Sequence, residues 1–564
     1  MKEPLNGSVI RTITRVAATA LGLVVVAAAP AAASATSYVS TSGSDSNDGS
    51  YTRPWRTLQR AANSAGAGTY VSIASGTYAP FSISRSGASG APATFERASG
   101  ASVTVASSGG NAITIAARYV KISGLRITGA TSGQNAGVQI LDGSASIVVS
   151  GNRIYGNIFG INASGSTNVA IGYNNVYNNA TGIQINRSGA GDRIFSNRVH
   201  DQNRMIVNDS TSGNDYGAVG INFLHTAGPA SAYGNVIYNN RAPSHDYGWD
   251  GSGFEIYGAS NVRMTGNRMY NNETVIETGK ASSDAGCYNN VFTRNIAYGA
   301  APTSTTEVLG LQLRCASNML VANNSLSDLT DWIYNLETSG TFAASIDGLR
   351  ILNNTTWQNG RLIYAVANVP STVRIDNNVD HTTYAIMKYN GTPLFGLSSV
   401  QSRTPFLDHA VAADPQFVDR ASGNLALRST SPAINRGTVI GGVTNGYLGF
   451  APDSGAVEYG ATSAIPSPAG DPVAGAVGSS ATAPVAAPAV AAAAASAPSI
   501  AYTPPTARTV MSPTAAHPVR TPRSKTGRTK HHTKHSKHSK HSKHSKHSTH
   551  STHARHARHS SQRG

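Results

Sequence analysis

The chain has 564 residues, of which 13% are charged and 40% are hydrophobic, so it can bury a large core. The formal net charge of +16 is a property of the tail, because residues 461–564 hold 14 Lys and Arg against one Asp, whereas residues 36–460 are nearly neutral. Apart from the first 35 residues, no segment is apolar over a length that could span a membrane.

The first 35 residues have the pattern of a signal peptide. Lys2, Arg11 and Arg15 precede an apolar run over residues 16–29, and Ala33-Ser34-Ala35 supplies the small residues of a cleavage site. The run is shorter than the ~20 residues that cross a bilayer, which favours cleavage over anchoring. We therefore predict a secreted, extracellular protein with no membrane span after cleavage.

The segment after the leader predicts a strand, a turn-rich loop and a short helix. Trp55, Leu58, Ala61 and Ala62 fall on one face of a helix over about residues 55–65. From Tyr70 on, short β-branched runs are separated by Gly, Asn and Ser, with no room for helices of ordinary length. This pattern disfavours a doubly wound α/β sheet and favours stacked strands, whose first coil the helix can cover.

One pattern recurs along these strands and places a polar residue between apolar ones, so that it faces away from the apolar side chains. The polar positions are Gln139, Asn162, Gln184, Asn222, Glu255, Glu277 and Gln312. They are 23, 22, 38, 33, 22 and 35 residues apart, which indicates a unit of about 22 residues with loops inserted into some copies. The column is neutral except at the two glutamates.

A second unit begins with asparagine and continues with an outward and then an apolar residue. Its copies begin at Asn152, Asn174, Asn197, Asn235, Asn267, Asn289, Asn324 and Asn377. Stacked asparagine side chains can hydrogen-bond along a column. Two or three short strands per unit predict an all-β fold, a right-handed parallel β-helix, because propeller repeats are longer, ~40–50 residues.

The composition divides the chain into four parts. We predict a signal peptide at 1–35, a parallel β-helix domain at 36–460, an Ala/Pro/Ser-rich linker at 461–519 and a disordered Lys/His/Ser-rich basic tail at 520–564. Insertions at about 201–219, 240–252 and 299–308 are expected to form a cleft on one face of the column. We expect the protein to be a monomer.

The chain resembles the secreted right-handed parallel β-helix, or pectate-lyase-like, proteins over about residues 37–460. The resemblance lies in the opening from Tyr38 to Tyr78 and in the closing Ser431-Pro432-Ala433-Ile434 with Glu458-Tyr459. It implies the fold more than it implies an activity.

The central stretch is also similar to the family 6 polysaccharide lyases, which include alginate lyases and chondroitinase B. The similarity lies in Lys280, Asn289-Asn290-Val291-Phe292 and Leu311-Gln312-Leu313-Arg314. It implies that Lys280 is a catalytic base, that Arg314 assists as an acid, and that calcium is held by Asn222, Glu255 and Glu277. The chain departs from that family at Cys315, where histidine is usual, and in the longer interval between Lys280 and Arg314.

Calcium at such a site would neutralise a uronate carboxylate and make the neighbouring C5 proton more acidic. We therefore predict a calcium-assisted lyase that cleaves an acidic, uronate-containing polysaccharide by β-elimination. Substrate-binding side chains are expected on the column or in and beside the inserted loops: His225, His245, Asp246, Asp250 and Tyr257.

Three alternatives stay open. The glutamates could be solvated residues in salt bridges with Lys280 and Arg314. The surface could instead bind carbohydrate or adhere without turnover. A further alternative is a glycoside hydrolase with Glu255 and Glu277 as its acid pair.

The tail predicts a partner of its own. Its histidines recur at every third position from His532 to His559 among lysines and arginines. Such a polycation can hold an exported protein to anionic cell-wall polymers, and its histidines can bind transition metals. Cys287 and Cys315 are the only cysteines, and the sequence leaves their pairing open.

Overall fold

The structure is a computed structural model that describes residues 35–461, except residues 189, 212, 300–307, 341, 359 and 366–368. The predicted signal peptide, linker and basic tail therefore lie almost wholly outside the described residues. Within the described part of the chain, no helix is long and apolar enough to cross a membrane.

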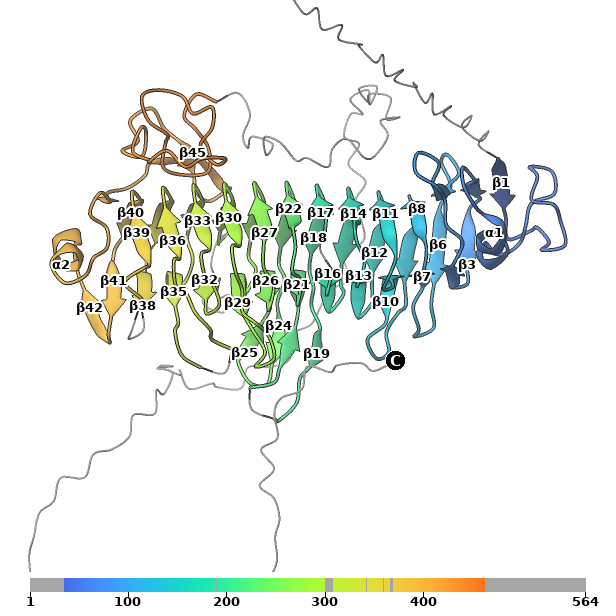
Figure 1. Cartoon of the computed structure of the whole chain (residues 1–564), viewed down its shortest axis with the longest axis horizontal. Coiled ribbons are helices and arrows are strands. Elements are labelled where there is room, and N and C mark those ends of the chain that lie inside the picture. Colours follow the sequence, from blue (N-terminus) through green and yellow to red (C-terminus); the bar gives the residue numbers. More distant parts are fainter. Residues whose placement is uncertain are drawn as a thin grey trace, which may run out of the picture. The chain divides into compact units, whose positions relative to one another are not determined.

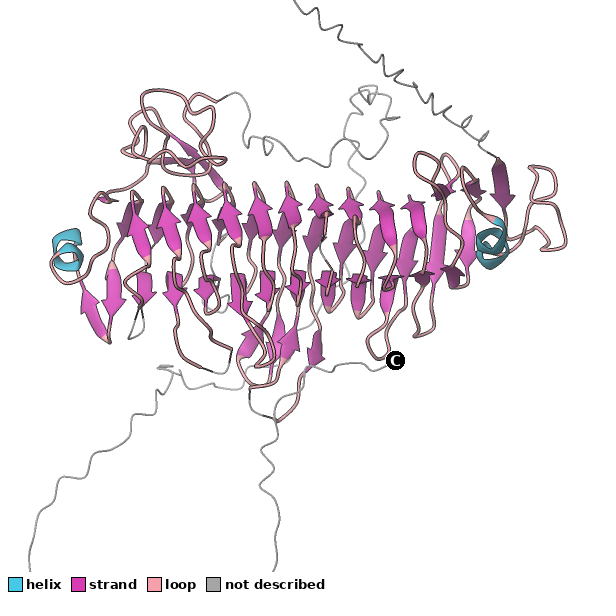
Figure 2. Ribbon diagram, in the orientation of Figure 1, coloured by secondary structure: helices cyan, strands magenta, loops and turns pink. Residues whose placement is uncertain are grey.

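Three sheets of 13 strands each make up a right-handed parallel β-helix, which confirms the predicted fold class (Figures 1 and 2). Neighbouring strands in each sheet are parallel, apart from one antiparallel pair at the end of the second sheet. We name the sheets the first sheet, the site sheet and the ladder sheet.

The first sheet consists of β1 (Thr36–Val39), β2 (Tyr70–Ile73), β5 (Ala93–Arg97), β8 (Arg118–Ser123), β11 (Ala145–Ser150), β14 (Ala170–Gly172), β17 (Asp192–Phe195), β22 (Ala230–Tyr233), β27 (Val262–Thr265), β30 (Val291–Thr293), β33 (Leu320–Ala322), β36 (Arg350–Leu352) and β39 (Arg374–Asp376). The site sheet consists of β4 (Phe81–Ile83), β7 (Ile113–Ile115), β10 (Ala136–Ile140), β13 (Phe159–Ser164), β16 (Thr181–Asn186), β21 (Val219–Leu224), β26 (Ser252–Tyr257), β29 (Thr274–Gly279), β32 (Leu309–Leu313), β35 (Trp332–Leu336), β38 (Arg361–Ala365), β41 (Met387–Tyr389) and β42 (Thr392–Leu394). The ladder sheet consists of β3 (Gly76–Tyr78), β6 (Val103–Ala106), β9 (Arg126–Thr128), β12 (Arg153–Tyr155), β15 (Asn175–Tyr177), β18 (Arg198–His200), β23 (Val236–Tyr238), β28 (Arg268–Tyr270), β31 (Ile296–Tyr298), β34 (Ser325–Ser327), β37 (Thr355–Gln358), β40 (Val379–Thr382) and β43 (Val411–Ala412).

Two helices and three short antiparallel pairs complete the fold. The helices are α1 (Leu58–Ser64) and α2 (Leu397–Gln401), and the pairs are β19 (Met205–Val207) with β20 (Tyr216–Gly217), β24 (Ala242–Ser244) with β25 (Gly248–Asp250), and β44 (Phe417–Asp419) with β45 (Asn424–Leu427). Helix α1 lies against β1 and β4, the first strands of two sheets, so the predicted capping helix is confirmed. It begins after Thr57, whose side chain accepts a hydrogen bond from the Arg60 amide.

Alternation along the strands separates the core from the outer faces. In the site sheet Ile221, Phe254, Ile276 and Leu311 are paired in register and fully buried, and each is followed by an outward polar residue. In three of these four strands a glycine precedes the pair, at Gly220, Gly253 and Gly310, and close packing of the coils requires it, whereas Val275 precedes the pair in β29. A Cβ atom at Gly253 would lie 2.8 Å from the Val275 carbonyl oxygen and 3.1 Å from the Asn272 side-chain nitrogen.

The predicted asparagine column exists as a buried ladder in which each side-chain amide donates to the oxygen of the next, at 2.9–3.1 Å. Its members are Asn152, Asn174, Asn197, Asn235, Asn267, Asn295, Asn324, Asn354 and Asn378. The prediction for Asn377 is wrong by one residue, because Asn378 is the ladder member before β40. The prediction for Asn289 is wrong because that segment leads into β30 of the first sheet and Asn295 takes the ladder position. The two segments have the same local pattern, and only strand pairing distinguishes them.

The core also holds a buried carboxyl that should make stability depend on pH. Asp380 on β40 lies inside the coil beside Thr356, whose hydroxyl donates to it at 2.8 Å, and burial raises the pKa of Asp380 from 3.8 to about 7. The folded state therefore keeps a proton that the unfolded state loses, and stability falls as pH rises between these two values.

We predict that Asp380→Asn removes this dependence. Between pH 5 and pH 8 the wild type should lose about 2–3 kcal/mol more unfolding free energy than the variant, measured by urea denaturation. The control is Asp142→Asn on an exposed loop, which should follow the wild type. Parallel curves for wild type and Asp380→Asn would contradict the prediction.

Candidate functional site

The polar column predicted from the sequence is present on the outer face of the site sheet. Strand register pairs Gln139, Asn162, Gln184, Asn222, Glu255, Glu277 and Gln312 in that order. The amides form a chain, because Asn162 donates to Gln139 and Gln184 donates to Asn162 at 3.1 Å, and Asn222 donates to Gln184 at 3.4 Å. The chain stops at Asn222, whose buried side-chain oxygen has no hydrogen-bond partner among the described residues.

Glu255 follows Asn222 in the column, at the middle of β26. Among the described residues its carboxyl has no hydrogen-bond or ion-pair partner, although it lies between Asn222 and Glu277. Loss of water is the largest cause that raises the pKa of Glu255, to about 7, and the nearby Asp250 raises it further while Arg314 lowers it. A protonated Glu255 would supply the donor that the Asn222 oxygen lacks.

Arg314 is the cation of the site. It follows β32 directly, and its guanidinium forms ion pairs with Glu277 and, at 3.9 Å, with Glu337, which follows β35. The side chain also lies over the ring of Phe342, 5.6 Å from its centroid. Burial lowers the pKa of Arg314, and the neighbouring Glu337 opposes that change. Arg314 therefore balances two carboxylates and also acts on Glu255.

The insertion at 240–252 brings a second carboxyl to the column. It forms the hairpin of β24 and β25, which projects from the middle of the β-helix (Figure 1). Asp250 ends this hairpin, and its side chain accepts a 2.7 Å hydrogen bond from the Gly251 amide. Burial raises the pKa of Asp250 to about 7, and Asp215 raises it further. Tyr247 on the same hairpin interacts electrostatically with both Asp250 and Arg314, so the hairpin lies near the column.

His225 and Tyr257 lie at the carboxyl ends of β21 and β26. The His225 ring is held by Asp284, 2.7 Å from its Nδ1 atom, and meets Tyr257 edge-on with ring centroids 6.2 Å apart. Burial raises the pKa of Tyr257, with further contributions from Glu255 and Asp284, so the phenol keeps its proton. Tyr257 therefore interacts both with Glu255 of the polar column and with His225.

Lys280 lies beside this group, directly after β29. Its ammonium donates to the backbone carbonyls of Ala281 and Asp284 at 3.0 and 3.1 Å. These two bonds hold the ammonium against the loop that carries Asp284.

The other two predicted substrate-binding residues lie at the turn of the hairpin. The His245 side chain is 60% exposed, and Asp246 accepts hydrogen bonds from the amides of Gly213, Asn214 and Asp215. Asp246 therefore stabilises the neighbouring insertion at 201–219 through these hydrogen bonds.

The predicted calcium ligands are adjacent but fit a calcium ion only in part. The Asn222 oxygen and the Glu255 carboxyl are available, whereas Glu277 is bound by Arg314. Calcium takes six to eight oxygen ligands, so the available pair would have to be completed by water and substrate. Within the described ranges, no group of three or more His, Cys, Asp or Glu is placed to hold a metal ion.

Cys287 and Cys315 form a disulfide, which settles the pairing that the sequence left open. The bond joins the loop that carries Lys280 and Asp284 to the residue after Arg314, across 28 positions of sequence. It therefore ties together two segments of the candidate site.

Sequence reasoning missed Tyr247, Asp284 and Glu337. Glu337 follows Leu336, which pairs with Leu313 before Arg314, so the strand register was the signal for it. Tyr247 and Asp284 are in loops with no repeat to mark them.

Comparison with known proteins agrees with the architecture. Residues 41–84 match a family described as a protein of unknown function, DUF1565. An uncharacterized protein, YwoF, of Bacillus subtilis (strain 168) is 27% identical over 438 residues, covering 70% of this chain and 91% of its own.

The similar solved structures include the pectate lyase Pel9A (15% identity, TM-score 0.45, 76% of this chain and 97% of that chain) and XylC with xylose (12% identity, TM-score 0.46, 68% and 87%). A mannuronic-acid-specific family 6 lyase from human gut microbiota is 13% identical, with a TM-score of 0.38, and the match covers 62% of this chain and 87% of that chain. Similarity at this level concerns the fold only.

Proposed function

We propose that this protein is a secreted polysaccharide-cleaving enzyme whose proton-transfer group is Glu255. The observation that carries the proposal is one carboxyl in a column of paired amides, without a protein partner among the described residues and with a pKa of about 7. A glutamine at this position would continue the chain of hydrogen-bonded amides, whereas a glutamate makes the fold less stable. A role in proton transfer can explain why the position nevertheless holds a glutamate.

The arrangement best supports hydrolysis of a glycosidic bond by Glu255 and Asp250. Both carboxyls have a pKa of about 7, and the charge of Asp250 helps to raise the pKa of Glu255, so an ionised Asp250 favours a protonated Glu255. The Gly251 amide stabilises ionised Asp250, whereas Glu255 has no such donor among the described residues. Glu255 therefore protonates the leaving glycosidic oxygen, and Asp250 accepts a proton from the attacking water or acts as nucleophile.

This pair differs from Glu255 and Glu277, the acid pair of the hydrolase that the sequence left as an alternative to the lyase. The Glu277 carboxylate is bound in an ion pair by Arg314, so it is not available for proton transfer. Arg314 also keeps the pKa of Glu255 near neutrality.

The second candidate is the calcium-assisted lyase, favoured by the unpaired Asn222 oxygen beside Glu255. Carboxyls outnumber cations here, so an anionic uronate would need an added cation. When bound at Asn222 and Glu255, calcium would supply that positive charge and acidify the C5 proton. Lys280 would be the base in this reaction and Arg314 the assisting acid.

One assay distinguishes the candidates. The full chain is incubated with pectate, alginate, a glycosaminoglycan and neutral xylan, with calcium or with a chelator, while new reducing ends and ultraviolet absorbance of unsaturated uronate are followed. We expect reducing ends without that absorbance, insensitivity to the chelator, and activity that falls as pH rises through about 7 while Glu255 ionises.

Two other outcomes would reject hydrolysis. Chelator-sensitive absorbance that is lost in Lys280→Ala would establish the lyase and reject hydrolysis. Binding without either product would establish a carbohydrate-binding surface and reject both enzymes.

A further inference from the structure

A second charged surface lies on the ladder sheet, away from the polar column. Its outer face carries two parallel columns of side chains, because each short strand points its first and third residues outward. The first residues form what we call the basic column, in which four of six are arginines: Arg126, Arg153, Asn175, Arg198, Val236 and Arg268. The aromatic column is Tyr155, Tyr177, His200, Tyr238, Tyr270 and Tyr298, paired in register and stacked with ring centroids 4.6–5.3 Å apart.

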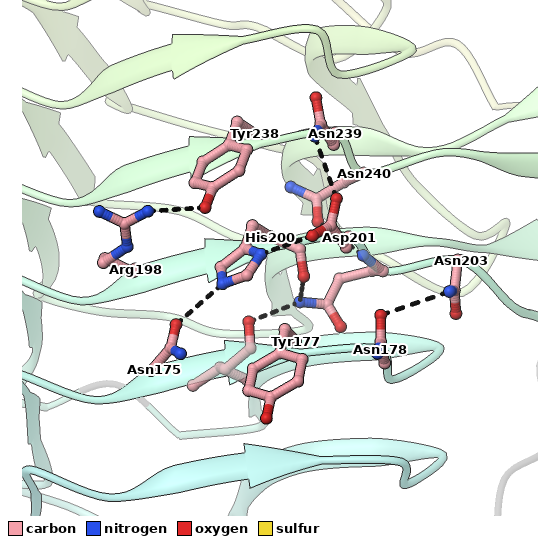
Figure 3. Close-up of polar contacts among 12 residues, drawn as sticks. Asn175, Tyr177, Asn178, Arg198, His200, Asp201, Asn203, Tyr238, Asn239 and Asn240 are labelled. Carbon is pink, nitrogen blue, oxygen red and sulfur yellow. Dashed lines mark hydrogen bonds and ion pairs between the residues drawn. The ribbon is translucent and has the colours of Figure 1, made fainter. Parts of the chain in front are cut away.

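The stacked rings are held in place by polar contacts (Figure 3). The His200 ring is bonded to Asp201 through Nδ1 at 2.7 Å and to Asn175 through Nε2 at 2.8 Å, and it is parallel to Tyr238 within 1°. The Arg198 guanidinium donates to the Tyr238 hydroxyl at 2.8 Å. Within the stack each ring covers a face of the next, so apart from the end face of Tyr155 the column presents edges, hydroxyl groups and guanidinium groups to a partner.

The basic column has charges that nothing in the described structure balances. Arg126 on β9 and Arg153 on β12 are exposed and directly opposite one another, and neither guanidinium has a hydrogen-bond or ion-pair partner there. Like charges directly opposite one another on paired strands destabilise a sheet. An anion bound between the two arginines would make the electrostatic interaction at this position attractive. The five strands β9, β12, β15, β18 and β23 contain no acidic residue.

These two arginines line a depression. Its volume is about 370 Å³, its charged lining residues are Arg97, Arg126 and Arg153, and no carboxylate of the described residues lines it. Arg97 reaches it from β5 across Gly124, where a Cβ atom would lie 2.7 Å from the arginine Cγ, and it donates to the Ala101 carbonyl at 3.1 Å. Three guanidinium groups are thus brought together from three strands.

The chain itself covers the other end of the same face. Residues of the C-terminal segment 414–461 pack there, with Phe417 and Leu425 beside Tyr298. Arg268 of the basic column donates to the Ser422 carbonyl at 2.8 Å. Over β28 and β31 the columns are therefore already occupied by a polypeptide segment, one of whose carbonyl oxygens is bound by an arginine of the basic column. The columns over β9 to β23 continue the same surface.

We propose that the face formed by Arg97, Arg126, Arg153, Arg198 and the adjoining tyrosine edges binds an acidic polysaccharide. Guanidinium groups pair with carboxylates through two parallel hydrogen bonds, and the tyrosine and asparagine edges suit hydroxyl groups. A nucleic acid fits less well, because bases bind by stacking on open ring faces and only the end face of Tyr155 is left without a stacked ring. The site is separate from Glu255 and does not require turnover.

The test compares two double variants of the full chain, so that the basic tail contributes equally to both. Arg126→Gln/Arg153→Gln removes the two unpaired arginines, and Arg118→Gln/Arg263→Gln removes two exposed arginines of the first sheet with the same charge change. Dissociation constants are measured by fluorescence anisotropy with labelled polygalacturonate, dextran and single-stranded oligothymidylate at low and high salt.

We expect the first variant to bind polygalacturonate about tenfold more weakly at low salt and the second to change less than about twofold. Dextran should bind neither. Equal weakening in both variants, or no binding of polygalacturonate by the wild type, would overturn the proposal. An equal or larger loss for oligothymidylate would show a nucleic-acid surface instead. Hydrolysis at Glu255 should be unaffected by Arg126→Gln/Arg153→Gln on short oligosaccharides, which separates this site from the proposed function.

Discussion

Glu255→Gln is expected to reduce turnover at least about 100-fold while making the fold more stable. The loss follows from removal of the proton that the leaving oxygen requires, since general acid catalysis contributes about 10²–10⁴-fold. The stability gain follows because folding raises the pKa of Glu255 from 4.5 to about 7, so that above pH 4.5 ionisation increasingly favours the unfolded state. The substituted amide would stay neutral at every pH and could donate to the Asn222 oxygen.

Two measurements on the same protein check this prediction. Release of reducing ends gives the activity, and urea denaturation at pH 8 should show a gain of about 1–3 kcal/mol. The matched control is Glu96→Gln, an outward glutamate of the first sheet that lies 3.8 Å from Lys121, which should leave turnover unchanged. A stabilised Glu255→Gln protein with full activity would assign Glu255 a purely structural place in the column.

Arg314→Gln is expected to destabilise the protein by about 3 kcal/mol and to move the alkaline limb of the pH–rate profile upward. The destabilisation arises because Glu277 and Glu337 lose the cation between them in a partly buried position. The profile moves because Arg314 lowers the pKa of Glu255, so that its removal keeps the carboxyl protonated to a higher pH.

Arg361→Gln is the matched control. Arg361 on β38 of the site sheet pairs with Asp331, which directly precedes β35 and is 45% exposed, so loss of this pair should cost less than about 1 kcal/mol and leave the profile in place. If Arg314→Gln instead moved the alkaline limb of the pH–rate profile to lower pH, the guanidinium would not be acting on the carboxyl whose ionisation limits the rate.

The polar column of the site sheet follows from local properties of the sequence. Gln139 to Gln312 were placed correctly because strand alternation and a repeated interval are local properties, and stacking of equal coils turns a repeat into a column. The same logic failed at Asn289, where an asparagine pattern recurs in a different strand of the coil. A local motif does not say which of three sheets it enters.

The charges followed a different rule. The sequence predicts that Glu255 and Glu277 lie side by side and does not distinguish their roles. In the structure Glu277 forms an ion pair with an arginine, whereas Glu255 has no partner among the described residues. Asp250 reaches the column through a hairpin whose course the repeat does not specify. The roles of the two glutamates therefore depend on side chains from other coils.

What the amino-acid sequence determined by itself is the β-helix, its period and the column of outward polar groups, because these follow from alternation, glycine at close contacts and stacked asparagines. Only the tertiary structure decided which carboxyl is paired, which keeps its proton and which two arginines face each other without a counter-ion among the described residues. Those properties arise from desolvation and from charges brought together across coils more than about 20 residues apart in the chain, and no local pattern encodes them.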